Sequence, residues 1–292
     1  MNKLRTIFYS AFLFTSFCCN SNNDEEYFHA IRTNDIKLHT PREGEWLYAH
    51  KEKGQTLQQY ISANPARPSP QRSVIYLLPL GEFTEPQKQI LELTRQYTEI
   101  FFQLRTVLLK PVNDSAIPAT AKRETADNGL QILAPYILDS LLKKNIPDSA
   151  YALMAISEKD LYPKDDWNFV FGLASYTERA GVSSIYRFED KKPGNANFTL
   201  CTRRLMNVSS HEIGHMFSLH HCIYAKCVMN GSNSMPETDN TPNRLCSQCQ
   251  EKLYWNIRYN NKKRLGELCN FFRENKMERD LQILQADIKA TD

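Results

Sequence analysis

Four of the chain's seven histidines fall within eleven positions, from residue 211 to residue 221. His211, Glu212 and His215 form the pattern HExxH, which reads HEIGH in this chain. Residues four apart on a helix share one face about 6 Å apart along the axis, so both imidazoles can reach one metal ion. Glu212 then projects beside the metal, where a carboxylate can take a proton from water. The pattern predicts a hydrolytic zinc site.

A hydrolytic zinc site needs a third protein ligand and one open position for water. His221 follows His215 by six residues, beyond the expected end of the helix, where a chain reversal brings it back toward the metal. His220 is the alternative third ligand. The three histidines predict a catalytic zinc ion with Glu212 as the catalytic residue.

Two close pairs of cysteines follow the histidines, namely Cys222 with Cys227 and Cys246 with Cys249. Four thiols in two such pairs are typical of a closed, tetrahedral structural zinc site. Disulfide bonds are the alternative, since an exported protein can form them. Redox chemistry at the Cys-x2-Cys pair is a further alternative, which the second pair of thiols argues against.

The run HExxHxxSxxHC-x4-C-x-M followed by CxxC resembles the extended signature of the archaemetzincins, a branch of the metzincin zinc metalloproteases. The resemblance extends over about residues 70–265 and implies two zinc ions, peptide or protein substrates and aminopeptidase-like activity. It implies that Glu212 activates a zinc-bound water and that Met229 packs beneath the catalytic site. The implied ligands are His211, His215 and His221 for the catalytic zinc, and Cys222, Cys227, Cys246 and Cys249 for the structural zinc.

The chain departs from this signature at Ser218, where the family has glycine. Glycine allows the sharp turn, often with positive φ, that returns the third histidine to the metal. Serine in that conformation costs roughly 1 kcal/mol more, whereas metal binding contributes on the order of 10 kcal/mol. We expect the site to assemble with weaker zinc affinity.

A zinc metallopeptidase is the function that these residues favour. The alternative is a non-catalytic, zinc-stabilised binding protein of the cell envelope. Glu212 favours the enzyme, because a chain that uses zinc only for its shape needs no carboxylate at that position.

The elements that must position these residues alternate between strands and helices, which predicts an α/β fold with a mixed, metzincin-like sheet, an active-site helix and a smaller lower subdomain. In metzincins an edge strand pairs with extended substrate, and residues 181–188 are our candidate for it, with an interior strand as the alternative for this segment. Strands are predicted at 73–80, 106–112, 151–157, 167–176 and 181–188. Helices are predicted at 84–104 and 130–144. A third helix is expected from a cap near Thr202 through the HExxH pattern, and the tail after residue 250 is expected to be mostly helical.

The first 19 residues have a basic start and a short apolar run that ends in Cys18 and Cys19, which predicts a signal peptide of the lipoprotein type. The alternatives are a plain secretory signal and an uncleaved hydrophobic N-terminus. Either cysteine is a candidate for lipidation, so we expect an exported, lipid-anchored monomer of the cell envelope. Residues 20–70 are predicted to form a polar extension or linker, and residues 71–292 the metallopeptidase domain. The net charge of +3, without basic runs, indicates no nucleic-acid partner.

Overall fold

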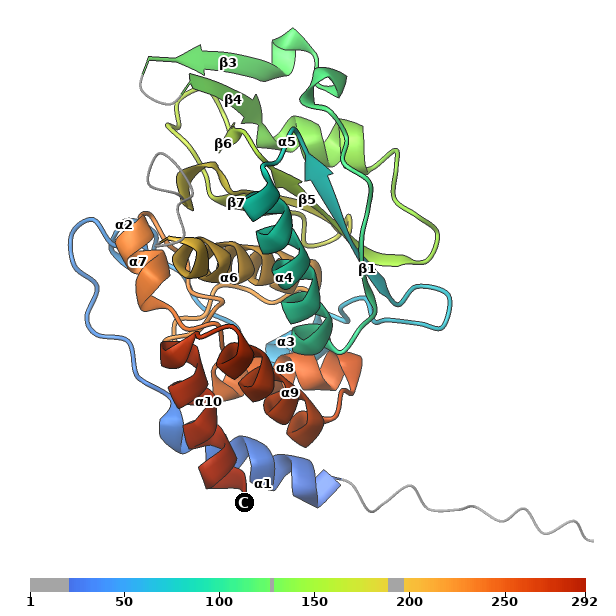
Figure 1. Ribbon diagram of the computed structural model, residues 1–292. Coiled ribbons are helices and arrows are strands. Elements are labelled where there is room, and N and C mark those ends of the chain that lie inside the picture. Colours follow the sequence, from blue (N-terminus) through green and yellow to red (C-terminus); the bar gives the residue numbers. More distant parts are fainter. Residues whose placement is uncertain (1–20, 127–128, 189–196) are drawn as a thin grey trace, which may run out of the picture.

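A mixed five-stranded sheet lies at the centre of the structure, a computed structural model that describes residues 21–126, 129–188 and 197–292 (Figure 1). The sheet confirms the predicted fold class. Only the edge strand β7 is antiparallel to its neighbour in this sheet. The strands in spatial order are β2 (Thr106–Leu108), β1 (Val74–Leu80), β5 (Ala150–Ser157), β8 (Ala180–Ser184) and β7 (Gly172–Ala174).

The sheet is buried on both faces. Successive side chains of a strand point to opposite faces, so each strand contributes to both layers of the core. In β5, Ala152, Met154 and Ile156 belong to one hydrophobic cluster, whereas Leu153 and Ala155 belong to another. The first cluster is covered by α4 (Glu85–Phe102) and α6 (Phe198–Met216), and the second by α5 (Ala134–Tyr136) and a π-helical turn (Ile137–Leu142). Near-continuous apolar strands are the consequence of this two-sided burial.

The helix predicted at 130–144 is wrong over its first four residues. They belong to β4 (Gly129–Leu133), which joins β3 (Lys122–Thr125) and β6 (Asp160–Tyr162) in a second, three-stranded sheet. The helix begins only at Ala134, where Pro135 fits the first turn because no intrahelical N–H bond is lost there. A short apolar run does not distinguish strand from helix by its periodicity.

Several predicted boundaries also need correction. The strand predicted at 106–112 ends at Leu108, with one further isolated bridge between Val112 and Leu80, and the strand predicted at 167–176 contains only Gly172–Ala174. The helix α6 begins at Phe198 and not near Thr202, whose hydroxyl donates to the Phe198 carbonyl inside the helix.

The edge strands of the five-stranded sheet are β2 and β7, and the segment 181–188 is not an edge strand. That segment forms most of β8, which pairs with β5 on one side and β7 on the other, and its last three residues form a 3₁₀ turn. An interior strand has no free backbone groups to offer a substrate, so the candidate of the sequence analysis is replaced by β7.

Four helices follow the active-site helix, and the prediction of a helical tail holds. They are α7 (Met235–Asn240), α8 (Ser247–Ile257), α9 (Asn261–Glu274) and α10 (Glu278–Thr291). Helices α8, α9 and α10 lie below α6 and the sheet in the view of Figure 1, whereas α7 lies beside α6. None of the helices within the described ranges combines the length and the apolar character that a bilayer crossing demands.

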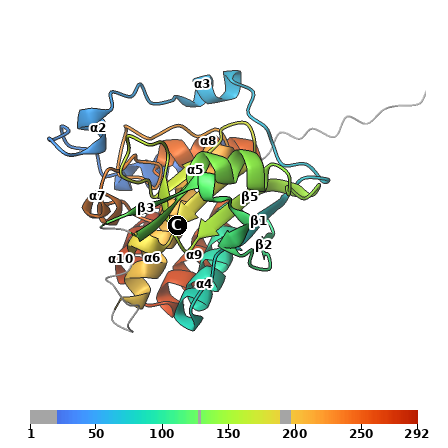
Figure 2. The ribbon, with the colours of Figure 1, turned by 90° about the horizontal axis from the view of Figure 1, so that it is seen from above.

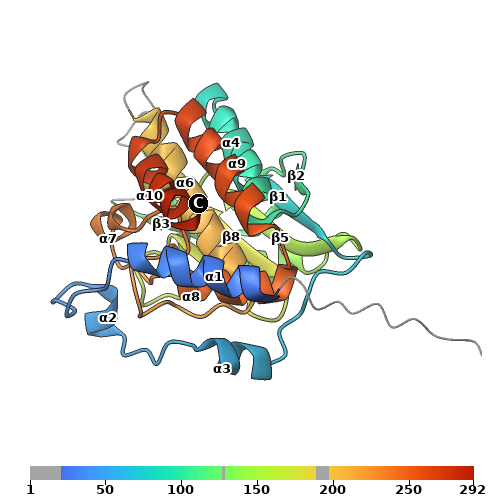
Figure 3. The same cartoon turned by 90° about the horizontal axis from the view of Figure 1, so that it is seen from below.

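The segment 21–70 packs against the rest of the protein over much of its length. It contains α1 (Ser21–Ile31), a 3₁₀ turn (Arg32–Asn34), α2 (Trp46–Ala49) and α3 (Leu57–Ser62). Tyr27, Ile31 and Tyr60 are buried in the main hydrophobic cluster. Helix α1 lies against α8, and the stretch from α2 to α3 runs along the outside of the molecule (Figures 2 and 3). The boundaries at residues 19 and 70 stay predictions, and Cys18 and Cys19 lie outside the described residues.

A buried ion-pair network joins this N-terminal segment to helices α8 and α10. Arg244 is 3% exposed and lies 2.8 Å from Asp35 of the N-terminal segment and 2.6 Å from Asp287 of α10. Both carboxylates are fully buried. The second oxygen of Asp35 also accepts a bond from the Ser247 hydroxyl at 2.5 Å, at the start of α8.

Arg244→Met is expected to lower the free energy of unfolding by roughly 3–5 kcal/mol, because it leaves two buried carboxylates without their cation. Urea unfolding of the zinc-loaded protein measures this change. Arg95→Met is the control, since Arg95 pairs with the partly exposed Glu92 and Glu99, and such pairs contribute up to about 1 kcal/mol. Equal effects of the two substitutions would contradict the prediction.

Candidate active site

Helix α6 places two histidines of the HExxH pattern side by side. The Nε2 atoms of His211 and His215 are 3.0 Å apart. The Nδ1 of His211 donates to the Val228 carbonyl at 2.8 Å, and that of His215 to the Leu219 carbonyl at 2.7 Å. A histidine that donates through Nδ1 leaves the Nε2 lone pair available, so both residues are oriented as metal ligands usually are.

The third histidine in this group is His221 and not His220. The ligand atoms of His211, His215 and His221 all lie within 4.8 Å of one another. His220 is exposed and its ring packs against Tyr176 at 5.2 Å. Zinc–nitrogen bonds of about 2.1 Å in a tetrahedron place two nitrogens about 3.4 Å apart, so the three histidines fit a zinc ion.

The turn between α6 and His221 has the conformation that the motif glycine would adopt. Ser218 has φ +63° and follows directly after the end of the helix, where the Leu219 N–H returns to the Gly214 carbonyl at 3.1 Å. Serine therefore accepts the left-handed conformation, and the site assembles despite the substitution.

Ser218→Gly is expected to raise the free energy of unfolding of the zinc-loaded protein by about 1 kcal/mol, since it removes the left-handed strain of a residue with a Cβ. Ser218→Ala is the matched control, because alanine keeps the strain and loses only the hydroxyl. Urea unfolding midpoints measure both. A glycine variant no more stable than the alanine variant would contradict the prediction.

Burial keeps His211 and His215 neutral, and metal ligands must be deprotonated. Desolvation, with a smaller effect from His221, lowers the pKa of His211 to about 3. Burial also lowers the pKa of His215 well below its ordinary value. These two ligands are therefore ready to bind a cation over the whole neutral range.

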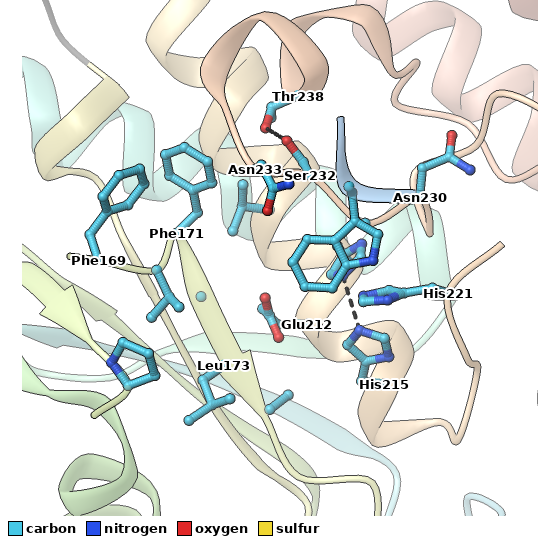
Figure 4. Close-up of a pocket in the computed structure, with 18 of the residues that line it drawn as sticks. Phe169, Phe171, Leu173, Glu212, His215, His221, Asn230, Ser232, Asn233 and Thr238 are labelled. Atoms are coloured by element: carbon cyan, nitrogen blue, oxygen red, sulfur yellow. Dashed lines mark hydrogen bonds between the residues drawn. The ribbon is translucent and has the colours of Figure 1, made fainter. Parts of the chain in front are cut away.

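Glu212 is buried directly beneath the edge strand. Its carboxylate is close to Gly172 of β7, where an added Cβ would lie 2.5 Å from Oε1. Figure 4 shows Glu212 between Leu173 of that strand and the two histidines His215 and His221. Burial raises the pKa of Glu212 to about 8, and a bound cation would lower it again by its opposite charge. The carboxyl group is placed to exchange a proton near neutral pH.

A cavity of about 480 Å³ opens over these groups. Apolar side chains from the loop before β7 line one side, and polar residues from the loop after Met229 line another (Figure 4). Its lining includes Trp46, Phe169, Phe171, Leu173, Tyr176, Ser232, Asn233 and Thr238. The sequence analysis assigned none of these residues to the site. A buried carboxyl group at the base of a largely apolar cavity, next to three metal-ligating side chains, can perform hydrolysis.

Met229 packs beneath the active-site helix, as the family resemblance implied. It is fully buried, and an added Cβ at Gly214 would lie 2.4 Å from its sulfur. The Met229 carbonyl accepts the N–H of Cys222 at 2.8 Å. The glycine within HEIGH therefore permits close packing between helix and methionine.

The four predicted cysteine ligands form a second group. The sulfur atoms of Cys222, Cys227, Cys246 and Cys249 lie within 4.8 Å of one another, and those of Cys222 and Cys246 are 3.6 Å apart. A disulfide needs about 2.05 Å, whereas tetrahedral zinc–sulfur bonds of about 2.3 Å separate two sulfurs by about 3.8 Å. Hydrogen bonds from the other three thiols lower the pKa of Cys222, and burial raises the pKa of Cys227. The geometry fits a zinc ion and not disulfides.

Comparisons with known proteins agree with this geometry. Residues 130–254 match the family model for peptidase family M54. Archaemetzincin-2 of Homo sapiens is 33% identical over 250 residues, which cover 75% of this chain and 68% of that protein. The chain belongs to the archaemetzincin family. It is a zinc-dependent metallopeptidase, a hydrolase whose substrates are peptides or proteins.

Two archaeal archaemetzincins are similar to about two thirds of this chain. Archaemetzincin of Thermococcus kodakarensis is 31% identical over 185 residues, which cover 63% of this chain and 97% of that protein. The crystal structure of archaemetzincin from Methanopyrus kandleri has a TM-score of 0.53 and 26% identity, and it covers 66% of this chain and 99% of its own. The enzyme therefore has residues beyond those that these archaeal proteins match.

Proposed function

We propose that this metallopeptidase cleaves peptide bonds at the centre formed by His211, His215 and His221, with Glu212 as general base and acid. The observation that carries the proposal is the convergence of three Nε2-bearing rings and one buried carboxyl group at the base of one cavity. Cys222, Cys227, Cys246 and Cys249 would hold a second, structural zinc ion, which gives two zinc ions per chain.

The chain's own residues divide the chemistry between them. Zinc, when bound by the three histidines, supplies a Lewis acid that acidifies water and polarises a carbonyl group. Glu212 takes the proton of the attacking water and delivers it to the leaving amine, so the carboxyl group ends the cycle as it began. The apolar wall formed by Phe169, Phe171 and Leu173 limits access of bulk water to this exchange.

The edge strand β7 is the element that we assign to substrate alignment. It pairs with β8 on one side only and borders the cavity on the other. An extended peptide can add to such an edge through main-chain hydrogen bonds. Gly172 lies directly above Glu212, so a peptide bond held there would pass close to the carboxyl group.

The position of the cut is the finer part of the proposal, and we assign aminopeptidase-like action on short peptides. The family resemblance supports this action. The test is hydrolysis of a mixed peptide library by the zinc-loaded protein, with free and N-acetylated members. Release of single N-terminal residues from the free peptides alone supports the assignment, whereas internal cuts in both sets would make the enzyme an endopeptidase.

Attachment to the cell envelope through Cys18 or Cys19 remains our proposal for localisation. The basic start and the apolar run before these cysteines support it. Mass spectrometry of the mature N-terminus after expression in a bacterial host that processes lipoproteins tests it. A diacylglycerol-modified cysteine is expected, and an unmodified terminus at any other residue would contradict the proposal.

A further inference from the structure

The N-terminal segment carries a carboxylate to the third histidine of the site. The Oε1 atom of Glu52 accepts a hydrogen bond from Nδ1 of His221 at 2.6 Å and another from Nε1 of Trp46 at 2.9 Å. Glu52 and His221 are 169 residues apart in the chain. The Trp46 ring also packs edge-on against the His221 ring, with centroids 5.1 Å apart.

This contact distinguishes His221 from the other two histidines. The Nδ1 atoms of His211 and His215 bond to main-chain carbonyls within the catalytic region, so the fold of that region orients both rings. His221 follows a strained turn and its Nδ1 bonds to a side chain of a distant segment. Its orientation therefore depends on how firmly that segment is held.

The segment is held by bonds to the same turn. Gln55 donates from Nε2 to the Ser218 carbonyl at 3.1 Å and accepts the His220 N–H at 3.3 Å. Tyr60 donates to the Phe217 carbonyl at 2.7 Å. Residues 52–60 thus contact the turn from its first residue to the histidine, and we call residues 46–60 the clamp.

The other end of the clamp is fixed beside the cavity. The Trp46 N–H donates to Oε1 of Glu237 at 2.8 Å. The Trp46 ring is packed so closely on Gly231 that an added Cβ there would lie 2.4 Å from the indole. The indole N–H and the ring face are therefore both fixed, and they fix Glu52 in turn. The clamp lies outside the residues 130–254 that match the family model.

We propose that Glu52 is a positioning residue at the catalytic zinc site: Glu52 orients His221 and makes its imidazole a stronger ligand. The clamp thereby compensates for serine at position 218. A carboxylate that accepts the second N–H of a ligating histidine fixes the ring and raises its basicity, and loss of such a partner lowers metal affinity by roughly 10- to 100-fold. The inference rests on the proposed function, since it requires zinc at the three histidines.

The test measures zinc affinity at the histidine site by competition with a chromophoric chelator, on the full chain with zinc at the cysteine site. Glu52→Ala is expected to lower the affinity by roughly 10- to 100-fold. Glu52→Gln keeps the acceptor without its charge and is expected to lose less. The unfolding midpoint of the form with zinc at the cysteines alone is expected to stay that of the parent in both variants, which separates positioning from general stability.

Glu45→Gln is the matched control. Glu45 lies in the same N-terminal segment and pairs with the exposed His39 at 2.8 Å, and neither residue lines the cavity. Its zinc affinity is expected to equal that of the parent.

Three results would overturn the inference. The first is parental zinc affinity in Glu52→Ala, and the second is a loss of stability without a loss of affinity. If Glu52→Ala fails to fold, Glu52→Gln decides, and parental affinity in that variant overturns the inference. A parent chain that binds no zinc at its histidines overturns the proposed function as well, and this outcome is distinct because it appears before any substitution.

Discussion

Glu212→Gln is expected to lower kcat/KM for peptide hydrolysis by roughly 10²- to 10⁴-fold, the usual contribution of a positioned general base. Glutamine has the same shape, so it fits beneath Gly172, where the carboxylate already occupies the space that a Cβ would need. Its amide cannot take a proton from water. Zinc content per chain is expected to remain that of the parent, because the three histidine ligands are unchanged.

The comparison needs kinetics and metal analysis on the same samples. Atomic emission gives zinc per chain, and hydrolysis of a peptide cleaved by the parent gives kcat/KM. Glu267→Gln, on the exposed face of α9 beside Lys263, controls for loss of a carboxylate and is expected to retain parental values. A fully zinc-loaded Glu212→Gln variant with the parental rate would show that another group moves the proton.

The residues that could be predicted from sequence are those whose geometry is local. His211 and His215 are one helical turn apart, so their convergence follows from the helix alone. The cysteines of the two pairs are five and three residues apart, so short loops likewise bring their thiols together. His221 required the family resemblance, since only the turn at Ser218 decides between it and His220.

The residues that could not be predicted depend on contacts between distant segments. Trp46 and Glu52 follow no periodic pattern, and their partners are more than 160 residues away in sequence. Polar composition and the prolines at positions 65, 68 and 70 led to the prediction that residues 20–70 form an extension or linker. The polar groups of the clamp form hydrogen bonds with the rest of the protein, and composition alone does not reveal this. The edge position of β7 likewise depends on the order of the strands in the sheet, which the sequence of a three-residue strand does not encode.

The cysteine group has a consequence for the catalytic centre, because Cys222 directly follows His221. Cys246 lies 3.6 Å from Cys222 and its N–H donates to the Cys227 sulfur at 3.3 Å, so these thiols join the loop after His221 to the start of α8. As metal ligands the four buried sulfurs are thiolates, and their charge requires a cation. The cysteine site therefore fixes the chain on the far side of the third histidine, as the clamp fixes its near side.

Cys246→Ser is accordingly expected to remove the structural zinc and to destabilise the fold severely. Zinc binding at structural sites contributes about 10–16 kcal/mol in small peptides, which is as large as the whole stability of a typical domain, about 5–15 kcal/mol. Thermal unfolding followed by circular dichroism, with zinc analysis, measures the effect. The variant is expected to lose its cooperative transition or to unfold far below the parent.

Cys269→Ser is the matched control, since Cys269 is a buried thiol outside the four-sulfur group. It is expected to keep two zinc ions and a cooperative transition, with only the modest loss that a buried hydroxyl causes, roughly 1–3 kcal/mol. Equal behaviour of the two serine variants would show that the four sulfurs hold no metal. If Cys246→Ser instead loses zinc at both sites, the shared loop between Cys222 and His221 is the physical reason, because a ligand whose neighbour is released no longer has a fixed position.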